Sequence, residues 1–160
     1  LKDIYGLKTN KSYEEIEYNF VRCFYKQILK EHVIEILEYF KSKDIPLYVL
    51  SNSMYSTELV SKELEEFGIK HYFKQIVSSG DHLVRKPSQE LFKLYLKKFD
   101  MIGISASDVC YIGNDPYFDI ETPVKLGMKA VHLGDQDVDH GTYLEISSYL
   151  KLIEEFKKYE

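Results

Sequence analysis

From residue 45 onward, short apolar runs alternate with segments in which apolar residues recur at helical spacing, and this alternation constrains the fold most strongly. Strands and helices that alternate through short loops are typical of an α/β protein with a Rossmann-like, doubly wound parallel sheet. Ligands of such proteins bind at the carboxyl ends of the strands. The predicted strands are 46–50, 73–77, 109–113 and 130–133; the predicted helices are 55–67, 87–99, a short one from 118, and a last one carrying Leu144, Leu150, Ile153 and Phe156.

Two further helices are predicted before this alternation begins. Ser12 and Glu15 have the spacing of a capping box, which marks the start of a helix. Apolar residues then recur every four positions, at Ile16, Phe20, Phe24 and Ile28. We expect this amphipathic helix of about five turns to pack its apolar stripe against the rest of the protein. A second helix is predicted over 33–43.

Polar side chains gather where the predicted strands end. Ser51 and Asn52 follow the strand at 46–50, and Lys86 lies in the loop after 73–77. A hydroxyl and backbone amides at a strand-to-helix turn can hold phosphate oxygens. A lysine that arrives from a separate loop can neutralise a phosphoryl group as a point charge. The sequence therefore predicts a phosphate-binding rim, with Ser51 and Lys86 as catalytic groups and all three residues as substrate-binding groups.

A second polar group follows the strand at 109–113. Asn114 and Asp115 come directly after Gly113, and Asp119 lies four residues further on. Carboxylate and amide oxygens suit Mg²⁺, which keeps several waters and takes few protein ligands. The ion would screen the repulsion between an anionic substrate and an anionic nucleophile. We therefore expect Asn114, Asp115 and Asp119 to form a magnesium site.

Each of these residues also has a simpler structural interpretation. Asp115 could form an Asx-turn that starts a helix, with Pro116 in the first turn. Ser51 could be a helix N-cap, and Lys86 could be an exposed loop lysine. The functional interpretation rests on the convergence of all of them at one edge of one predicted sheet.

Composition narrows the class of protein. The 160 residues fit one domain, and a net charge of −5 without a basic cluster argues against a nucleic-acid-binding surface. No apolar run approaches the roughly 18 residues of a membrane span, and no signal peptide is visible. Cys23 and Cys110 lack metal-ligand spacing, which favours reduced thiols in a cytoplasmic protein. The chain begins at Leu1 without a methionine, which indicates a processed or partial chain.

Three segments together resemble the haloacid dehalogenase (HAD) superfamily of hydrolases. The segment 47–52 looks like its second motif, 85–87 like its third, and 111–120 like its fourth. The resemblance covers roughly residues 33–153 and implies that Ser51 binds the transferring phosphoryl group. It also implies that Lys86 stabilises that group and the nucleophile, and that the acidic motif around Asp115 and Asp119 holds Mg²⁺.

Two departures from the family pattern have consequences. The fourth motif usually has an aspartate directly after the glycine, where this chain has Asn114. The first motif, Asp-x-Asp on the central strand, has no match in residues 1–45. By this resemblance, residues 1–32 are the remnant of a small helical cap, and 33–160 form a HAD-like core without its first strand. We expect two unpaired sheet edges, at 46–50 and 109–113, that self-association or a missing N-terminal segment would complete.

Three functions are consistent with these residues. The first is a Mg²⁺-dependent phosphatase that acts on a small phosphorylated metabolite through an aspartyl-phosphate; a 2-haloacid dehalogenase is a close variant that needs no Mg²⁺. The second is a catalytically silent phosphate-binding or regulatory module that keeps the rim and lacks the nucleophile. The third is another doubly wound domain, such as a receiver domain, whose motifs coincide by chance. Neither nucleic acid nor a membrane is expected as a partner.

Overall fold

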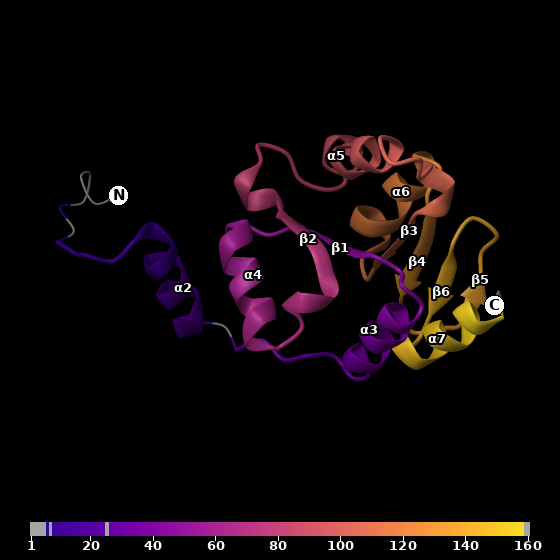
Figure 1. The fold of residues 1–160 in the computed structure, drawn as a ribbon, viewed down its shortest axis with the longest axis horizontal. Helices are drawn as coiled ribbons and strands as arrows, with labels where there is room; N and C mark the ends of the chain where they lie inside the picture. The colour runs from indigo at the N-terminus through magenta and orange to yellow at the C-terminus, as the bar shows by residue number, and fades with distance from the viewer. Residues whose placement is uncertain (1–5, 7, 25, 159–160) are drawn as a thin grey trace.

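The computed structural model describes residues 6, 8–24 and 26–158, and Figure 1 shows the order of the elements. The helices are α2 (Tyr13–Phe24), α3 (Val33–Ser42), α4 (Thr57–Glu66), α5 (Gln89–Asp100), α6 (Glu121–Lys125) and α7 (Tyr149–Lys157). The strands are β1 (Leu47–Ser51), β2 (Phe73–Ser78), β3 (Cys110–Gly113), β4 (Lys129–Leu133), β5 (Val138–Asp139) and β6 (Leu144–Ile146). None of the described helices is long and apolar enough to cross a membrane.

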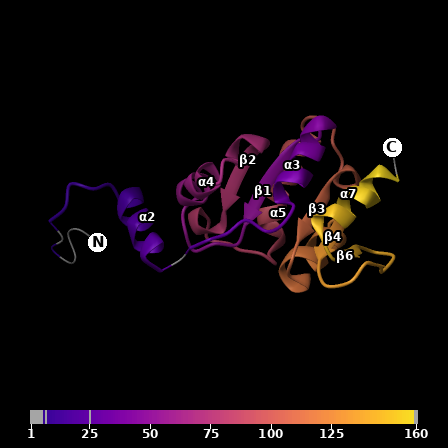
Figure 2. The same cartoon turned by 90° about the horizontal axis from the view of Figure 1, so that it is seen from below.

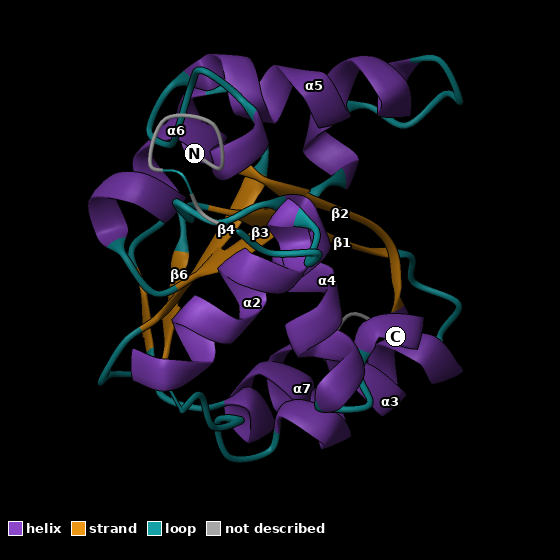
Figure 3. Ribbon diagram, turned by 90° about the vertical axis from the view of Figure 1, so that its left-hand side faces the viewer, coloured by secondary structure: helices purple, strands orange, loops and turns teal. Residues whose placement is uncertain are grey.

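The strands pair in parallel, as the alternating pattern predicts. β1 pairs with β2, and β3 pairs with β4, which in turn pairs with β6; only β5 runs antiparallel to its neighbour. Helices lie on both sides of the strands, with α5 and α6 on one side and α3 and α7 on the other (Figure 3). The predicted α/β class with parallel strand pairing is confirmed.

A hydrophobic core cluster lies where α3 and α7 cover the sheet that contains β4. Alternation along β3 directs Cys110 and Ile112 toward this cluster and Tyr111 toward the other face, where its ring meets Phe92 of α5. The two faces of β3 are therefore held by different helices. The buried residues of the cluster are Ile36, Phe40, Val131, Ile146 and Leu152.

β1 and β3 belong to two separate sheets. None of the described strands lies between them, and a cavity of about 790 Å³ is lined by both strands and by α3, α5 and α7. All residues of β1 and β3 are only half-buried, although a strand at the centre of an α/β sheet is normally buried on both faces. Among the described strands, β1 and β3 thus each have one edge without a strand partner, as predicted, and the cavity between them explains their incomplete burial.

Cys110 lines this cavity, and its burial raises the pKa of the thiol to about 11. The thiolate is the reactive form, so the alkylation rate of Cys110 should rise roughly tenfold per pH unit between pH 8 and 10. The measurement is iodoacetamide modification of a Cys23→Ser variant, followed by mass spectrometry. A rate that levels off near pH 9 would contradict the raised pKa.

Two expectations about the N-terminal helix, its length and the packing of its apolar stripe, are wrong. α2 ends at Phe24 and does not reach Ile28 as expected, and Figures 1 and 2 show it at one end of the molecule, nearest to α4. Its apolar stripe is not packed: Phe20 is 62% and Phe24 69% exposed, whereas Val21 is 2% exposed. The capping box is confirmed, since Ser12 and Glu15 exchange backbone-to-side-chain hydrogen bonds of 2.9 and 3.2 Å.

Two smaller predictions are also wrong. Leu144 belongs to β6, where it pairs in register with Val131, because backbone pairing to β4 and β5 replaces the helix expected there. Pro87 lies outside α5, since the side chain of Ser88 caps that helix by accepting a hydrogen bond from Glu90 N.

Candidate functional site

The carboxyl ends of β1 and β3 bring the predicted rim together on both sides of the cavity. Ser51 is the last residue of β1 and pairs in register with Ser78 at the end of β2. Gly113 ends β3, and Asn114 and Asp115 follow it. Ser51 does not cap a helix, because the N-cap of α4 is Ser56. The interpretation of Ser51 as a helix N-cap is therefore excluded.

Lys86 is buried at this rim rather than exposed in a loop. Its Nζ donates to Asp119 Oδ1 at 2.5 Å and to the Tyr111 hydroxyl at 2.9 Å, and only 7% of the residue is exposed. Asn52 holds the backbone of Lys86 from both sides, because its Nδ2 donates to Lys86 O at 3.0 Å and its Oδ1 accepts from Lys86 N at 2.8 Å. Asn52 thus fixes the loop that delivers the cation.

Asp119 orders the turn that follows β3. Its Oδ2 accepts hydrogen bonds from the backbone amides of Asn114 and Asp115, at 3.1 and 3.2 Å. Gly113 is required here, because a Cβ on it would lie 2.3 Å from Asp119 Cβ. Asp115 caps the following helical turn, since its Oδ1 accepts from two backbone amides. The Asx-turn interpretation of Asp115 is therefore correct as a description of its Oδ1.

Tyr111 links the two sheets across the cavity, a role that the sequence pattern did not suggest. Its hydroxyl donates to Leu50 O of β1 at 3.1 Å and accepts from Lys86 Nζ. Burial, and to a lesser extent the negative charge of Asp119, raise the pKa of Tyr111 above its ordinary value. The hydroxyl therefore keeps its proton and remains a donor to Leu50 O.

Hydroxyl groups at the end of β2 hold the turn that follows Ser51 and Asn52. The Ser79 hydroxyl accepts from Ser53 N at 3.0 Å and donates to Ser53 O at 2.9 Å. Ser78, which is fully buried, donates through Oγ to Tyr55 O at 2.6 Å. Sequence reasoning missed both serines, because a Ser-Ser pair at a strand end carries no signal of its own.

We expect Ser79→Ala to lower the free energy of unfolding by about 1–3 kcal/mol, because both backbone groups of Ser53 lose their partner in a half-buried turn. Chemical denaturation followed by circular dichroism measures the change. Ser107→Ala is the matched control, since Ser107 is exposed. Equal unfolding free energies for both variants would contradict this role of Ser79.

The oxygen donors after Gly113 are compatible with Mg²⁺, although they do not by themselves form a complete cage. Among the residues that the structure describes, no three His, Cys, Asp or Glu side chains are grouped to hold a metal ion. Asp119 is engaged by Lys86 and two amides, whereas Asp115 uses only Oδ1 in capping and Asn114 is exposed. Mg²⁺ is usually bound through one or two carboxylates and several waters, so this donor set fits the ion.

Comparison with known proteins adds independent findings. The sequence model of the haloacid dehalogenase-like hydrolases matches residues 4–133. The chain is 27% identical over 128 residues to glyceraldehyde 3-phosphate phosphatase of Methanocaldococcus jannaschii; the match covers 77% of this chain and 54% of that protein. The chain therefore spans about half the length of that curated relative.

Two solved structures are similar in fold. A HAD phosphatase from Thermococcus onnurineus superposes with a TM-score of 0.68 at 21% identity, over 97% of this chain and 68% of the other. The HAD-hydrolase YfnB from Bacillus subtilis, solved bound to magnesium, has a TM-score of 0.67 at 22% identity, over 79% of this chain and 54% of that one.

Proposed function

Because the chain belongs to the haloacid dehalogenase-like hydrolase family, we propose that its rim is the phosphate-binding and metal-binding half of a Mg²⁺-dependent phosphatase site. The observation that carries this proposal is the position of Lys86. Its buried ammonium group donates to Asp119 and to the hydroxyl of Tyr111, which lines the cavity, while Asn52 holds the backbone of Lys86. A buried cation fixed so firmly is suited to bind an anionic group that enters the cavity.

Ser51 and Asn52 supply the other substrate contacts in this proposal. Ser51 offers a hydroxyl at the end of β1, and the turn that follows offers backbone amides to phosphoryl oxygens. Asp115 and Asn114 would hold Mg²⁺, and Asp119 would orient Lys86 and the amides beside the ion. The ion, when bound, would neutralise charge on the phosphoryl oxygens.

We further propose that an extended segment pairs in parallel between β1 and β3 and carries the nucleophile. The resemblance to the family implies an Asp-x-Asp at the end of this strand. The first carboxylate would attack phosphorus and displace the substrate's alkoxide, which takes a proton from the second aspartate. Water would then hydrolyse the aspartyl-phosphate. Residues 1–32 would belong to a cap, and 33–160 to the core.

The substrate proposed for the complete site is a small phosphorylated metabolite. The curated relative from M. jannaschii is named for a three-carbon sugar phosphate, and half of its length is matched here. A silent phosphate-binding module is the second candidate. It is favoured by the ion pair of Lys86, whose carboxylate partner among the described residues is Asp119 rather than a group inside the cavity.

Hydrolysis of p-nitrophenyl phosphate tests the proposal. The assay uses the 160-residue chain with Mg²⁺, with and without a synthetic strand peptide that ends in Asp-x-Asp, and with excess chelator. We expect Mg²⁺-dependent turnover only when the peptide is present. A peptide that ends in Asn-x-Asn should give none. Binding of the Asp-x-Asp peptide without turnover would favour the silent module.

A further inference from the structure

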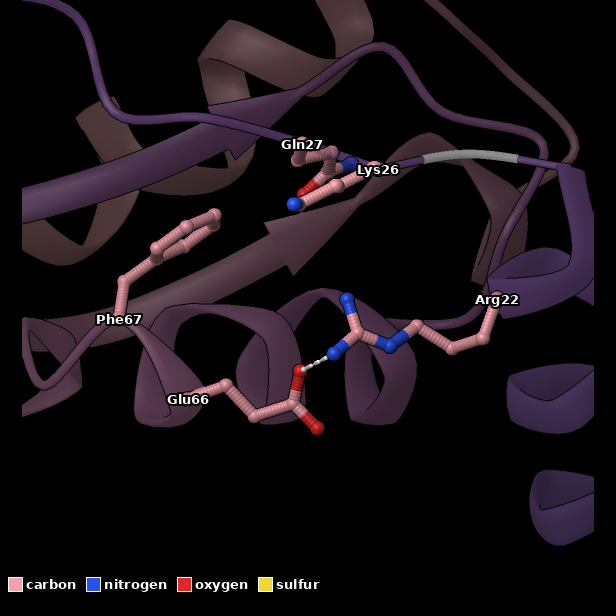
Figure 4. A pocket seen from close by; sticks show the side chains of 5 residues that line it. All are labelled: Arg22, Lys26, Gln27, Glu66 and Phe67. Atoms are coloured by element: carbon pink, nitrogen blue, oxygen red, sulfur yellow. Dashed lines mark ion pairs between the residues drawn. The ribbon is translucent and has the colours of Figure 1, made fainter.

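α2 is attached to α4 through polar side chains at two points. At the carboxyl end of α4, Arg22 forms an ion pair of 2.9 Å with Glu66, which Figure 4 shows beside Lys26, Gln27 and Phe67. The Tyr18 hydroxyl also bonds to Glu66. The side chains of this ion pair are 45% and 32% exposed, so this attachment is weakly stabilising on its own.

The second attachment lies at the amino end of α4 and is less exposed. The carboxylate of Glu17 accepts a hydrogen bond of 3.0 Å from Ser56 N and another of 2.5 Å from Ser56 Oγ. Ser56 is the N-cap of α4, and its Oγ accepts from Leu59 N at 3.1 Å. Because the Ser56 hydroxyl donates its hydrogen bond to Glu17, a lone pair of its oxygen stays directed at the Leu59 amide.

These two attachments fix the direction of α2. Glu17 contacts the first end of α4 and Arg22 contacts the last, so the two helices run side by side in the same direction. α4 begins directly after the turn that starts at Ser51 and Asn52. Glu17 therefore lies at the rim end of the molecule, where it contacts the residue that closes the turn.

We propose that Glu17 is a positioning residue for the phosphate-binding turn. It ties α2 to the turn 51–56 by orienting the Ser56 hydroxyl, and it thereby couples the docking of α2 to binding at the rim. This inference rests on the proposed function for the effect on phosphate, but not for the effect on Ser56 and α4. The coupling is reciprocal: an anion that orders the turn also strengthens the docking of α2.

Hydrogen exchange and phosphate binding test this role in the 160-residue chain. In Glu17→Gln, the Leu59 amide should exchange about fivefold faster, and the dissociation constant for inorganic phosphate should rise by about the same factor. Phosphate should slow exchange in α2 of the unchanged chain but not of this variant. Glu14→Gln is the matched control, because it removes the same charge from the same helix and its carboxyl bonds to Ser12.

Arg22→Gln separates positioning from simple docking. It loosens the far end of α2 and leaves Ser56 untouched, so Leu59 exchange should stay as in the unchanged chain and phosphate affinity should fall by less than in Glu17→Gln. Equal weakening of phosphate binding in Arg22→Gln and Glu17→Gln would overturn the proposal, as would unchanged Leu59 exchange in Glu17→Gln. If inorganic phosphate fails to protect the turn 51–56 in the unchanged chain, the proposed function is wrong, while Leu59 exchange still decides the role of Glu17.

Discussion

Lys86→Met is expected to lower the free energy of unfolding by about 3–5 kcal/mol and to abolish phosphate binding. The variant removes the only cation that is paired with the buried carboxylate of Asp119 among the described residues, and both side chains are about 8% exposed. An unpaired charge would then remain in a buried position. Urea denaturation and titration with inorganic phosphate measure the two effects.

Two controls separate the buried charge from general damage. Lys125→Met breaks an exposed ion pair with Glu121 and should change the unfolding free energy by less than about 1 kcal/mol. Lys86→Met combined with Asp119→Asn removes both charges and should recover part of the lost stability. A Lys86→Met variant as stable as Lys125→Met would show that the ion pair does not hold the rim.

A strand peptide that fills the cavity between β1 and β3 should stabilise the chain strongly. At a peptide concentration 100 times its dissociation constant, the gain is about 2.7 kcal/mol. For a chain of this size, that corresponds to a rise in melting temperature of about 5–11 °C. Without peptide, we expect low thermal stability or concentration-dependent self-association, because no described strand pairs with β1 or β3 on the side that faces the cavity. Scanning calorimetry and sedimentation velocity measure these properties.

A peptide with proline at its centre is the matched control, since proline has no N–H to donate to the ladder and is not tolerated in a strand paired on both sides. It should leave the melting temperature unchanged. The chain could instead be monodisperse, melt cooperatively at high temperature and respond to neither peptide. This result would contradict a strand-binding cavity between β1 and β3.

Local patterns predicted the elements that build the site, and non-local contacts decided the rest. The strands that end at Ser51 and Gly113 and the arrival of Lys86 at the same rim follow from the alternation of apolar runs. The burial of Lys86 depends on Asn52 and Tyr111, which lie 34 and 25 residues away from it in sequence. The spacing of apolar residues along the sequence does not predict contacts between residues so far apart.

The orientation of α2 could not be predicted for a related reason. Its apolar stripe satisfies the usual rule for a packed helix, yet polar contacts from Glu17 and Arg22 to α4 leave Phe20 and Phe24 facing outward. The period of a helix gives the position of its apolar face but not which surface the face meets. The β5–β6 hairpin was missed because its strands are too short to show a period.

The most direct test of a phosphate-binding rim is a titration of the 160-residue chain with inorganic phosphate and Mg²⁺, followed through backbone amide chemical shifts. We expect saturable shifts at 51–53, at Lys86 and at 113–119, all of which disappear in Lys86→Met. Shifts confined to other regions, or rim shifts that persist in Lys86→Met, would contradict a phosphate-binding rim built on Lys86.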